Sequence, residues 1–115
     1  MRAVIPGLIL LLSAPVAAGA ASLEEGKRIY DQLCVHCHKA NYDEKFGPGL
    51  AGIMERRDAA WVEKFLINPA EMIKSDEYAQ TLKEGNSYGL TMPALPDMKD
   101  ADKRASIIEY LKTIE

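Results

Sequence analysis

Apolar residues recur at helical spacing near both ends of the chain after residue 20. In the first such segment, Ser22 and Glu25 have the spacing of a capping box. In this motif the serine side chain accepts from the backbone N–H of the glutamate, and the glutamate side chain accepts from the backbone N–H of the serine. The apolar positions that follow are Leu23, Ile29, Tyr30 and Leu33. Gly26 interrupts this helix at a cost of about 1 kcal/mol relative to alanine. We therefore expect another helix to approach closely at Gly26.

The C-terminal segment is the expected neighbour of Gly26. Asp100 or Asp102 can cap it. Its apolar face consists of Ile107, Ile108, Leu111 and Ile114, with Tyr110 beside it. We expect these two terminal helices to pack together.

Two further helical patterns occupy the middle of the chain. One covers 58–68, is ended by Pro69 and has an apolar side of Trp61, Val62, Phe65 and Leu66. The other opens at Ser75 and stops at Gly85. No alternating run is long enough for a strand, so the sequence predicts an all-α fold of about four helices. Segments 39–57 and 86–98 are longer than usual connections, and loops of that length usually enclose something.

The charge pattern limits the kinds of partner. The chain of 115 residues has 14 Lys and Arg against 17 Asp and Glu, a formal net charge of −3. The two signs alternate along the sequence and form no basic stripe, so nucleic acid is not an expected partner.

The first 20 residues have the pattern of a secretory signal peptide. Arg2 supplies the positive charge, an apolar run covers 4–12, and 18–20 reads Ala-Gly-Ala, which is typical of a cleavage site. The apolar run is shorter than the roughly 18–20 residues that cross a bilayer. We expect cleavage after Ala20, no membrane span afterwards and a single domain over 21–115, a size at which the core alone is marginal.

Cys34, Cys37 and His38 form the sequence Cys-x-x-Cys-His, which is typical of covalent haem attachment. Two thiols three positions apart on one helical turn can each add to a haem vinyl group. The following histidine is then held beneath the macrocycle as an axial ligand of the iron. The motif predicts one haem c bound through Cys34 and Cys37, with His38 on the metal. His36 has no ligand role in this pattern and is expected to face solvent.

Three other functions of the cysteine pair are open. A thioredoxin-like redox pair needs a βαβ setting, and no strand pattern precedes the motif. A zinc site needs four ligands, which the two neighbouring histidines could complete only by bending five residues around one ion. A short disulfide in an exported protein is the third. The order Cys-x-x-Cys-His favours haem over these.

Met92 is the expected second axial ligand. It stands in Gly-Leu-Thr-Met-Pro, where Pro93 keeps it extended, as suits a residue that presents its sulfur from a loop. Met54 follows the histidine too closely to cross the macrocycle. Met72 lies in a helical or near-helical stretch, where packing in the core is the usual role. Met98 adjoins the cap of the last helix and is expected to pack beneath it.

Together these residues resemble the class I cytochrome c family over nearly all of 21–115. The sequence at 26–30 is similar to that family's first helix, 46–50 to its Gly-Pro-x-Leu segment, and 108–111 to its C-terminal helix. Met92 and Pro93 resemble its methionine loop. In the family, the carbonyl of the Gly-Pro proline accepts the second ring N–H of the haem histidine. The resemblance therefore implies a bond from His38 to Pro48.

One feature departs from the mitochondrial branch of the family. Trp61 follows the Gly-Pro segment much sooner than the tryptophan of that branch does, so the chain is similar to the shorter bacterial type. The indole N–H of Trp61 either reaches a haem propionate or the ring forms a wall of the pocket. Arg57 either pairs with a propionate or is an exposed arginine at a helix start.

The resemblance implies a soluble electron carrier of a respiratory chain, not an enzyme. Its location would be the periplasm, because covalent haem attachment in bacteria takes place outside the cytoplasm. A monomer with transient redox partners (reductases, oxidases or other cytochromes) is expected. If Met92 does not reach the iron, a ligand-binding or sensor haem protein with a vacant or labile sixth site is the alternative, and a haem-free dithiol protein is a third possibility.

Overall fold

The computed structural model describes residues 2–12 and 21–115, so the expected cleavage point after Ala20 lies outside the described residues. Residues 2–12 are exposed and contain no helix or strand. No helix in the described ranges is long and apolar enough to cross a membrane.

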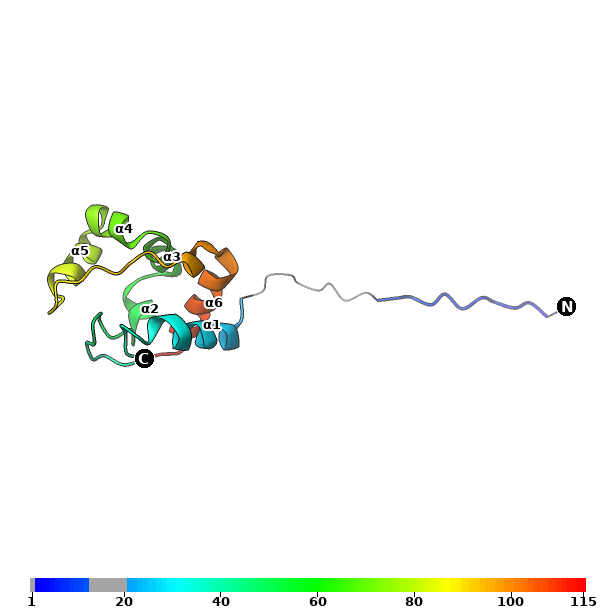
Figure 1. Ribbon diagram of the computed structural model, residues 1–115. Helices are drawn as coiled ribbons and strands as arrows, with labels where there is room; N and C mark the ends of the chain where they lie inside the picture. Colours follow the sequence, from blue (N-terminus) through cyan, green and yellow to red (C-terminus); the bar gives the residue numbers. More distant parts are fainter. Residues whose placement is uncertain (1, 13–20) are drawn as a thin grey trace.

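Helices are the only regular structure within 21–115. The elements in chain order are α1 (Leu23–Ile29), a π-helical turn η1 (Tyr30–Cys34), α2 (Ile53–Arg56), α3 (Ala59–Ile67), α4 (Pro69–Ser75), α5 (Glu77–Glu84), a 3-10 turn η2 (Pro96–Lys99) and α6 (Ala101–Leu111). Figure 1 shows α1 beside α6, with α3, α4 and α5 following one another on the other part of the domain. The predicted all-α class is confirmed.

The described residues contain more helices than the expected four because short helices form in two connecting segments. Pro69 does end α3, but the chain starts α4 at once. The side chain of Asn68 accepts from the backbone N–H of Glu71 (3.2 Å) and caps the new helix. Proline fits the first turn of a helix, where its missing N–H breaks no bond. The second short helix, α2, lies within the long segment 39–57.

Helices α1 and α6 pack closely at Gly26, as the sequence predicts. A Cβ atom at Gly26 would lie 1.9 Å from the backbone oxygen of Ser106. The rings of Tyr30 and Tyr110 lie beside this contact with their centroids 5.0 Å apart. The buried core cluster of the described residues consists of Ile29, Tyr30, Ile53, Val62, Leu66, Met98, Ile107, Ile108 and Leu111.

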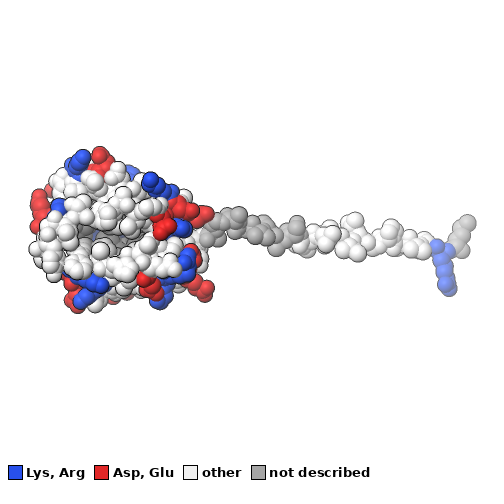
Figure 2. Space-filling model, in the orientation of Figure 1, with Lys and Arg blue, Asp and Glu red and all other residues white. Residues whose placement is uncertain are grey.

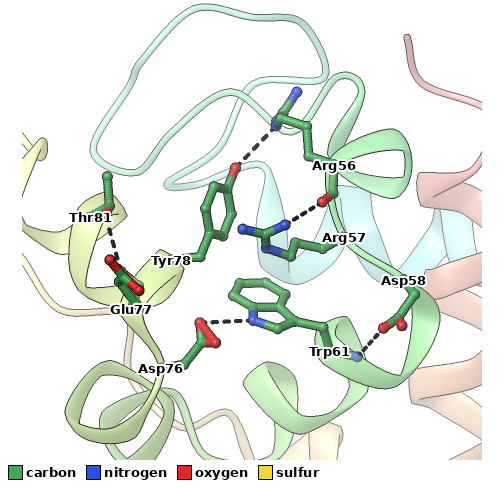
Figure 3. Close-up of a pocket in the computed structure, with 8 residues that line it drawn as sticks. All are labelled: Arg56, Arg57, Asp58, Trp61, Asp76, Glu77, Tyr78 and Thr81. Carbon is green, nitrogen blue, oxygen red and sulfur yellow. Dashed lines mark hydrogen bonds between the residues drawn. The ribbon is translucent and has the colours of Figure 1, made fainter.

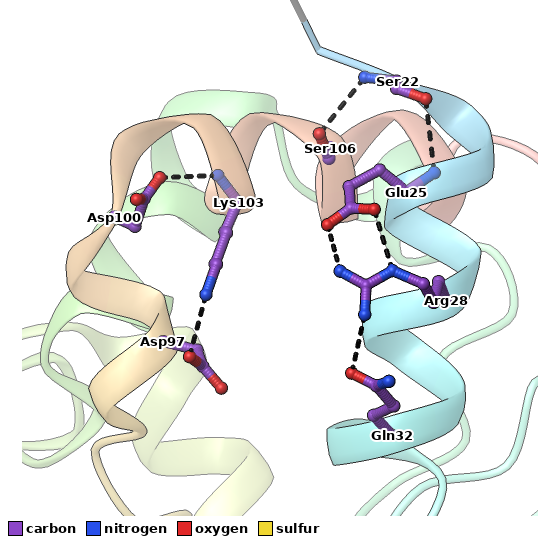
Figure 4. Close-up of polar contacts among 8 residues, drawn as sticks. All are labelled: Ser22, Glu25, Arg28, Gln32, Asp97, Asp100, Lys103 and Ser106. Atoms are coloured by element: carbon purple, nitrogen blue, oxygen red, sulfur yellow. Dashed lines mark hydrogen bonds and ion pairs between the residues drawn. The ribbon is translucent and has the colours of Figure 1, made fainter. Parts of the chain in front are cut away.

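The cap of α1 joins the two helices (Figure 4). The hydroxyl of Ser22 accepts from the backbone N–H of Glu25 at 3.2 Å, so the first half of the capping box is confirmed. The second half is wrong, because the carboxylate of Glu25 pairs with Arg28 instead. The backbone N–H of Ser22 donates to the hydroxyl of Ser106 on α6 (3.1 Å). Asp100, rather than Asp102, caps α6.

Candidate haem site

One largely apolar cavity of about 280 Å³ lies between α3, α5, α6 and the loops at 46–50 and 90–93. Figure 2 shows a hollow in one face of the domain, with uncharged atoms around it and Lys, Arg, Asp and Glu nearer the periphery. Cys34, Cys37, His38 and Met92 all line the cavity. The fold therefore brings together the four residues that the sequence singles out, although Met92 follows His38 by more than fifty positions.

Cys34 is the last residue of η1, and Cys37 lies in the turn that follows it. The backbone N–H of Val35 donates to the carbonyl of Tyr30 (3.0 Å), and the backbone N–H of His38 donates to the carbonyl of Cys34 (2.9 Å). Cys34 is half-buried and Cys37 is exposed, and neither forms a disulfide. Burial raises the pKa of the Cys34 thiol to about 11. His36 is exposed, as expected, and its Nε2 lies 3.0 Å from the carbonyl oxygen of Gln32.

The imidazole of His38 is oriented by its backbone surroundings. Its Nδ1 donates to the carbonyl oxygen of Pro48 at 2.7 Å, which confirms the bond implied by the resemblance. With the proton on Nδ1, Nε2 has a lone pair available for a metal. Burial lowers the pKa of His38, against the bond to Pro48, and favours the neutral imidazole that ligates iron. Gly47 lets the backbone approach, because a Cβ there would lie 2.5 Å from Cε1 of His38.

The structure separates the methionines by their surroundings. Met92 is half-buried in the cavity lining, next to Pro93. Met98 is 1 % exposed and packs in the core, as expected. Met54 packs against the same core from α2, and Met72 is half-buried on α4. Met92 is thus the only one of the four that lines the cavity.

A family model for cytochrome c matches residues 23–115. The chain belongs to the cytochrome c family. The cytochrome c2 of Rhodopila globiformis is 28% identical, with 79% of this chain and 92% of that protein covered. The structure of a cytochrome c from Rhodothermus marinus superposes with a TM-score of 0.69 at 22% identity, covering 88% of this chain and 89% of that one. A cytochrome c domain from Pseudomonas putida gives a TM-score of 0.62 at 28% identity, covering 76% and 84%.

Membership in this family makes the chain a haem c electron carrier, with the cofactor bound covalently. The cavity of this cytochrome c fits the group. Two thiols and an imidazole with a free Nε2 lie on its lining, and most of the remaining wall is aliphatic or aromatic. Apolar walls exclude water from a macrocycle and from the bonds to its iron.

Trp61 forms a wall of this cavity. Its indole N–H is bonded on the side of a neighbouring pocket, which Figure 3 shows. The indole Nε1 donates to the carboxylate of Asp76 at 3.0 Å. The ring stacks on Phe65 with centroids 5.3 Å apart. This bond and the N–H of Ala79 hold the pKa of Asp76 below its usual value. Of the two roles open for Trp61, the structure favours the wall.

The arginine that lines the cavity is Arg56, not Arg57. The guanidinium of Arg57 lies 3.6 Å above the ring of Tyr78 and donates to the carbonyl of Arg56 (2.7 Å). Arg56 donates to the carbonyl of Ala51 (3.1 Å) and to the hydroxyl of Tyr78 (3.2 Å). The only sequence signal was the Arg-Arg pair before the cap at Asp58, which does not show which arginine points inward.

Proposed function

We propose that this cytochrome c is a periplasmic electron carrier whose iron is held by His38 and Met92. The placement of both side chains on the lining of one cavity is the observation that carries the proposal. His38 and Met92 would hold the iron of the bound haem, which would supply one-electron exchange between Fe(III) and Fe(II), and the soft thioether of Met92 would raise its potential.

The residues of this chain orient the histidine ligand and exclude water from the core side of the cavity. Pro48 fixes the ring of His38, so the imidazole does not reorient when the charge on the iron changes. Aliphatic and aromatic side chains of α3 and α6 cover the cavity from the core side. A coordination sphere closed by Met92 leaves no site for a substrate and keeps rearrangement small.

The N-terminal 20 residues support export as part of the proposal. Their charge, apolar run and Ala-Gly-Ala end are those of a cleaved signal peptide, which leaves a domain of 21–115. A carrier in that compartment meets donor and acceptor proteins briefly, through small interfaces and as a monomer. Mass spectrometry of the exported protein should give an N-terminus at Ala21, and retention of residues 1–20 would contradict this part.

The axial ligand is tested by absorption of the oxidised protein. A Met–Fe(III) bond gives a weak band at the red end of the spectrum. We expect Met92→Leu to lose this band and Met98→Leu to keep it. Leucine is chosen at both positions because it conserves volume, which matters for the buried Met98.

Two results would contradict the ligation. The red band could survive in Met92→Leu, which would assign the sulfur to another residue. The wild-type protein could instead be high-spin and take up CO rapidly, which would support a ligand-binding or sensor protein.

A further inference from the structure

The loop that carries Met92 is organised around the side chain of Asn86. The amide oxygen Oδ1 of Asn86 accepts from the backbone N–H groups of Tyr88 (3.0 Å) and Leu90 (2.9 Å). The carbonyl of Asn86 accepts from Gly89 (3.2 Å), whose φ of 63° lies in the left-handed region that suits glycine. These bonds fix the turn that ends two residues before Met92. We call residues 86–95 the methionine loop.

The other end of the same side chain reaches residues 34–50, which we call the attachment loop. The amide nitrogen Nδ2 of Asn86 donates to the carbonyl of Phe46 at 2.7 Å. The N–H groups of Phe46 and Gly47 donate in turn to the carbonyl of Cys37, at 3.2 and 2.7 Å. A continuous set of hydrogen bonds therefore joins the haem-attachment motif to Leu90 through Asn86.

The amide can serve both loops in only one orientation. Two N–H donors face Oδ1 and one carbonyl faces Nδ2, so a flipped amide would set donors against donors. Two neighbouring contacts join the same two loops. The N–H of Ser87 donates to the carboxylate of Glu44 (3.3 Å), and the rings of Phe46 and Tyr88 have centroids 5.6 Å apart.

Past Leu90, the methionine loop is held by few polar contacts. Among the residues that the structure describes, no backbone N–H of residues 91–95 donates a hydrogen bond. The next bonded position is Leu95, whose carbonyl accepts from Met98 (3.0 Å). Met92 thus lies two residues after Leu90 and three before Leu95, and the bond that holds the nearer of these two positions is made by Asn86.

We propose that Asn86 is the positioning residue that holds Met92 at the iron, by joining the methionine loop to the attachment loop. This inference rests on the ligation proposed above. A loop that can bind or leave the iron has two states, and bonds made only in the bound state shift the population toward it. Removing those bonds gives an external ligand easier access to the sixth position.

Two substitutions at Asn86 separate its roles. Asn86→Ala removes both the acceptor Oδ1 and the donor Nδ2 of the side-chain amide. Asn86→Asp keeps an oxygen for Tyr88 and Leu90 but sets an acceptor against the carbonyl of Phe46. Asn68→Ala is the matched control, because Asn68 caps α4 (3.2 Å to the N–H of Glu71) and does not line the cavity.

The experiment is an imidazole titration of the oxidised, haem-loaded protein, followed through the red Met–Fe(III) band, with the midpoint potential measured in parallel. Asn86→Ala loses three side-chain hydrogen bonds, and we expect it to bind imidazole roughly 10- to 100-fold more tightly. Asn86→Asp loses only the bond to Phe46, so we expect it to bind imidazole roughly 10-fold more tightly. Both variants should have lower potentials than the wild type. Asn68→Ala should match the wild type in both measurements.

Wild-type affinity in Asn86→Ala would overturn the proposal. Wild-type affinity in Asn86→Asp would also overturn it, because the bond between the loops would then have no effect. An equal increase in Asn68→Ala would do the same, since it would indicate general loosening of the fold. A wild-type protein that lacks the red band would overturn the ligation itself, which distinguishes that failure from the others.

Discussion

Replacing Gly26 by alanine has two opposite effects on the free energy of unfolding: the higher helix propensity of alanine raises it, and the loss of close helix packing lowers it. By propensity alone, alanine inside α1 would stabilise the protein by about 1 kcal/mol. The new methyl carbon would, however, lie 1.9 Å from the oxygen and 2.6 Å from the carbon of the Ser106 carbonyl, and 3.0 Å from Cβ of Tyr110. The obstacle is mostly backbone, so α1 and α6 must separate by more than an ångström.

The cost of that separation exceeds the gain in propensity. Overpacking of a tight contact costs typically 1–3 kcal/mol, and about the upper end applies where backbone must move. The bond from the N–H of Ser22 to the hydroxyl of Ser106 would also stretch, at about 1 kcal/mol. We therefore expect the free energy of unfolding to fall by about 2–4 kcal/mol, which lowers the melting temperature by roughly 10–20 °C in a domain of this size.

Guanidinium denaturation of the oxidised, haem-loaded protein, followed by far-UV circular dichroism, measures this change. Gly85→Ala is the control, because Gly85 ends α5 with a φ of −80° and its Cβ would come no closer than 3.3 Å to the carbonyl oxygen of Thr81. We expect that variant to differ from the wild type by less than about 1 kcal/mol. A Gly26→Ala protein as stable as the wild type, or more stable, would refute the close packing of α1 on α6.

Three further predictions concern the haem site and its surroundings. Gly47→Ala places a methyl group 2.5 Å from Cε1 of His38, so we expect a lower yield of haem-loaded protein and a partly high-spin spectrum; wild-type yield and spectrum would contradict this. Burial raises the pKa of Tyr30 to about 12. Because an unfolded tyrosine ionises near pH 10, the free energy of unfolding should fall between about pH 10 and 12 by up to roughly 1.4 kcal/mol per pH unit, and Tyr30→Phe should remove this part of the slope. Trp61→Phe removes the N–H that the carboxylate of Asp76 accepts, so the pKa of Asp76 should rise in a carboxyl NMR titration, and an unchanged pKa would show that the bond has no effect.

The sequence by itself determined the features that depend on neighbours along the chain. Cys-x-x-Cys-His places two thiols and an imidazole on one turn, and the family match over 23–115 agrees with the cofactor that this motif predicts. The sequence limited the cap of α6 to Asp100 or Asp102, of which Asp100 forms it, and a proline after Met92 keeps that methionine out of a helix. Gly26 predicted a close helix–helix contact, because a glycine inside a helix lowers helix stability and is expected where another helix occupies the space of a side chain.

The tertiary structure alone decided contacts between residues far apart in sequence. Glu25 has the spacing to complete a capping box, yet the N–H of Ser22 bonds to Ser106, which lies 84 positions away. Of two adjacent arginines, only Arg56 lines the cavity, because Arg57 has an extended backbone and stacks on Tyr78.

Asn86 is the clearest case of this kind. From the sequence it is a polar residue after a helix-ending glycine, which predicts only a turn. Its bond to Phe46 spans 40 positions and exists only when the attachment and methionine loops are folded side by side. Local pattern therefore determined which residues could bind the haem and its iron, whereas the folded chain determined which other side chains hold them in place.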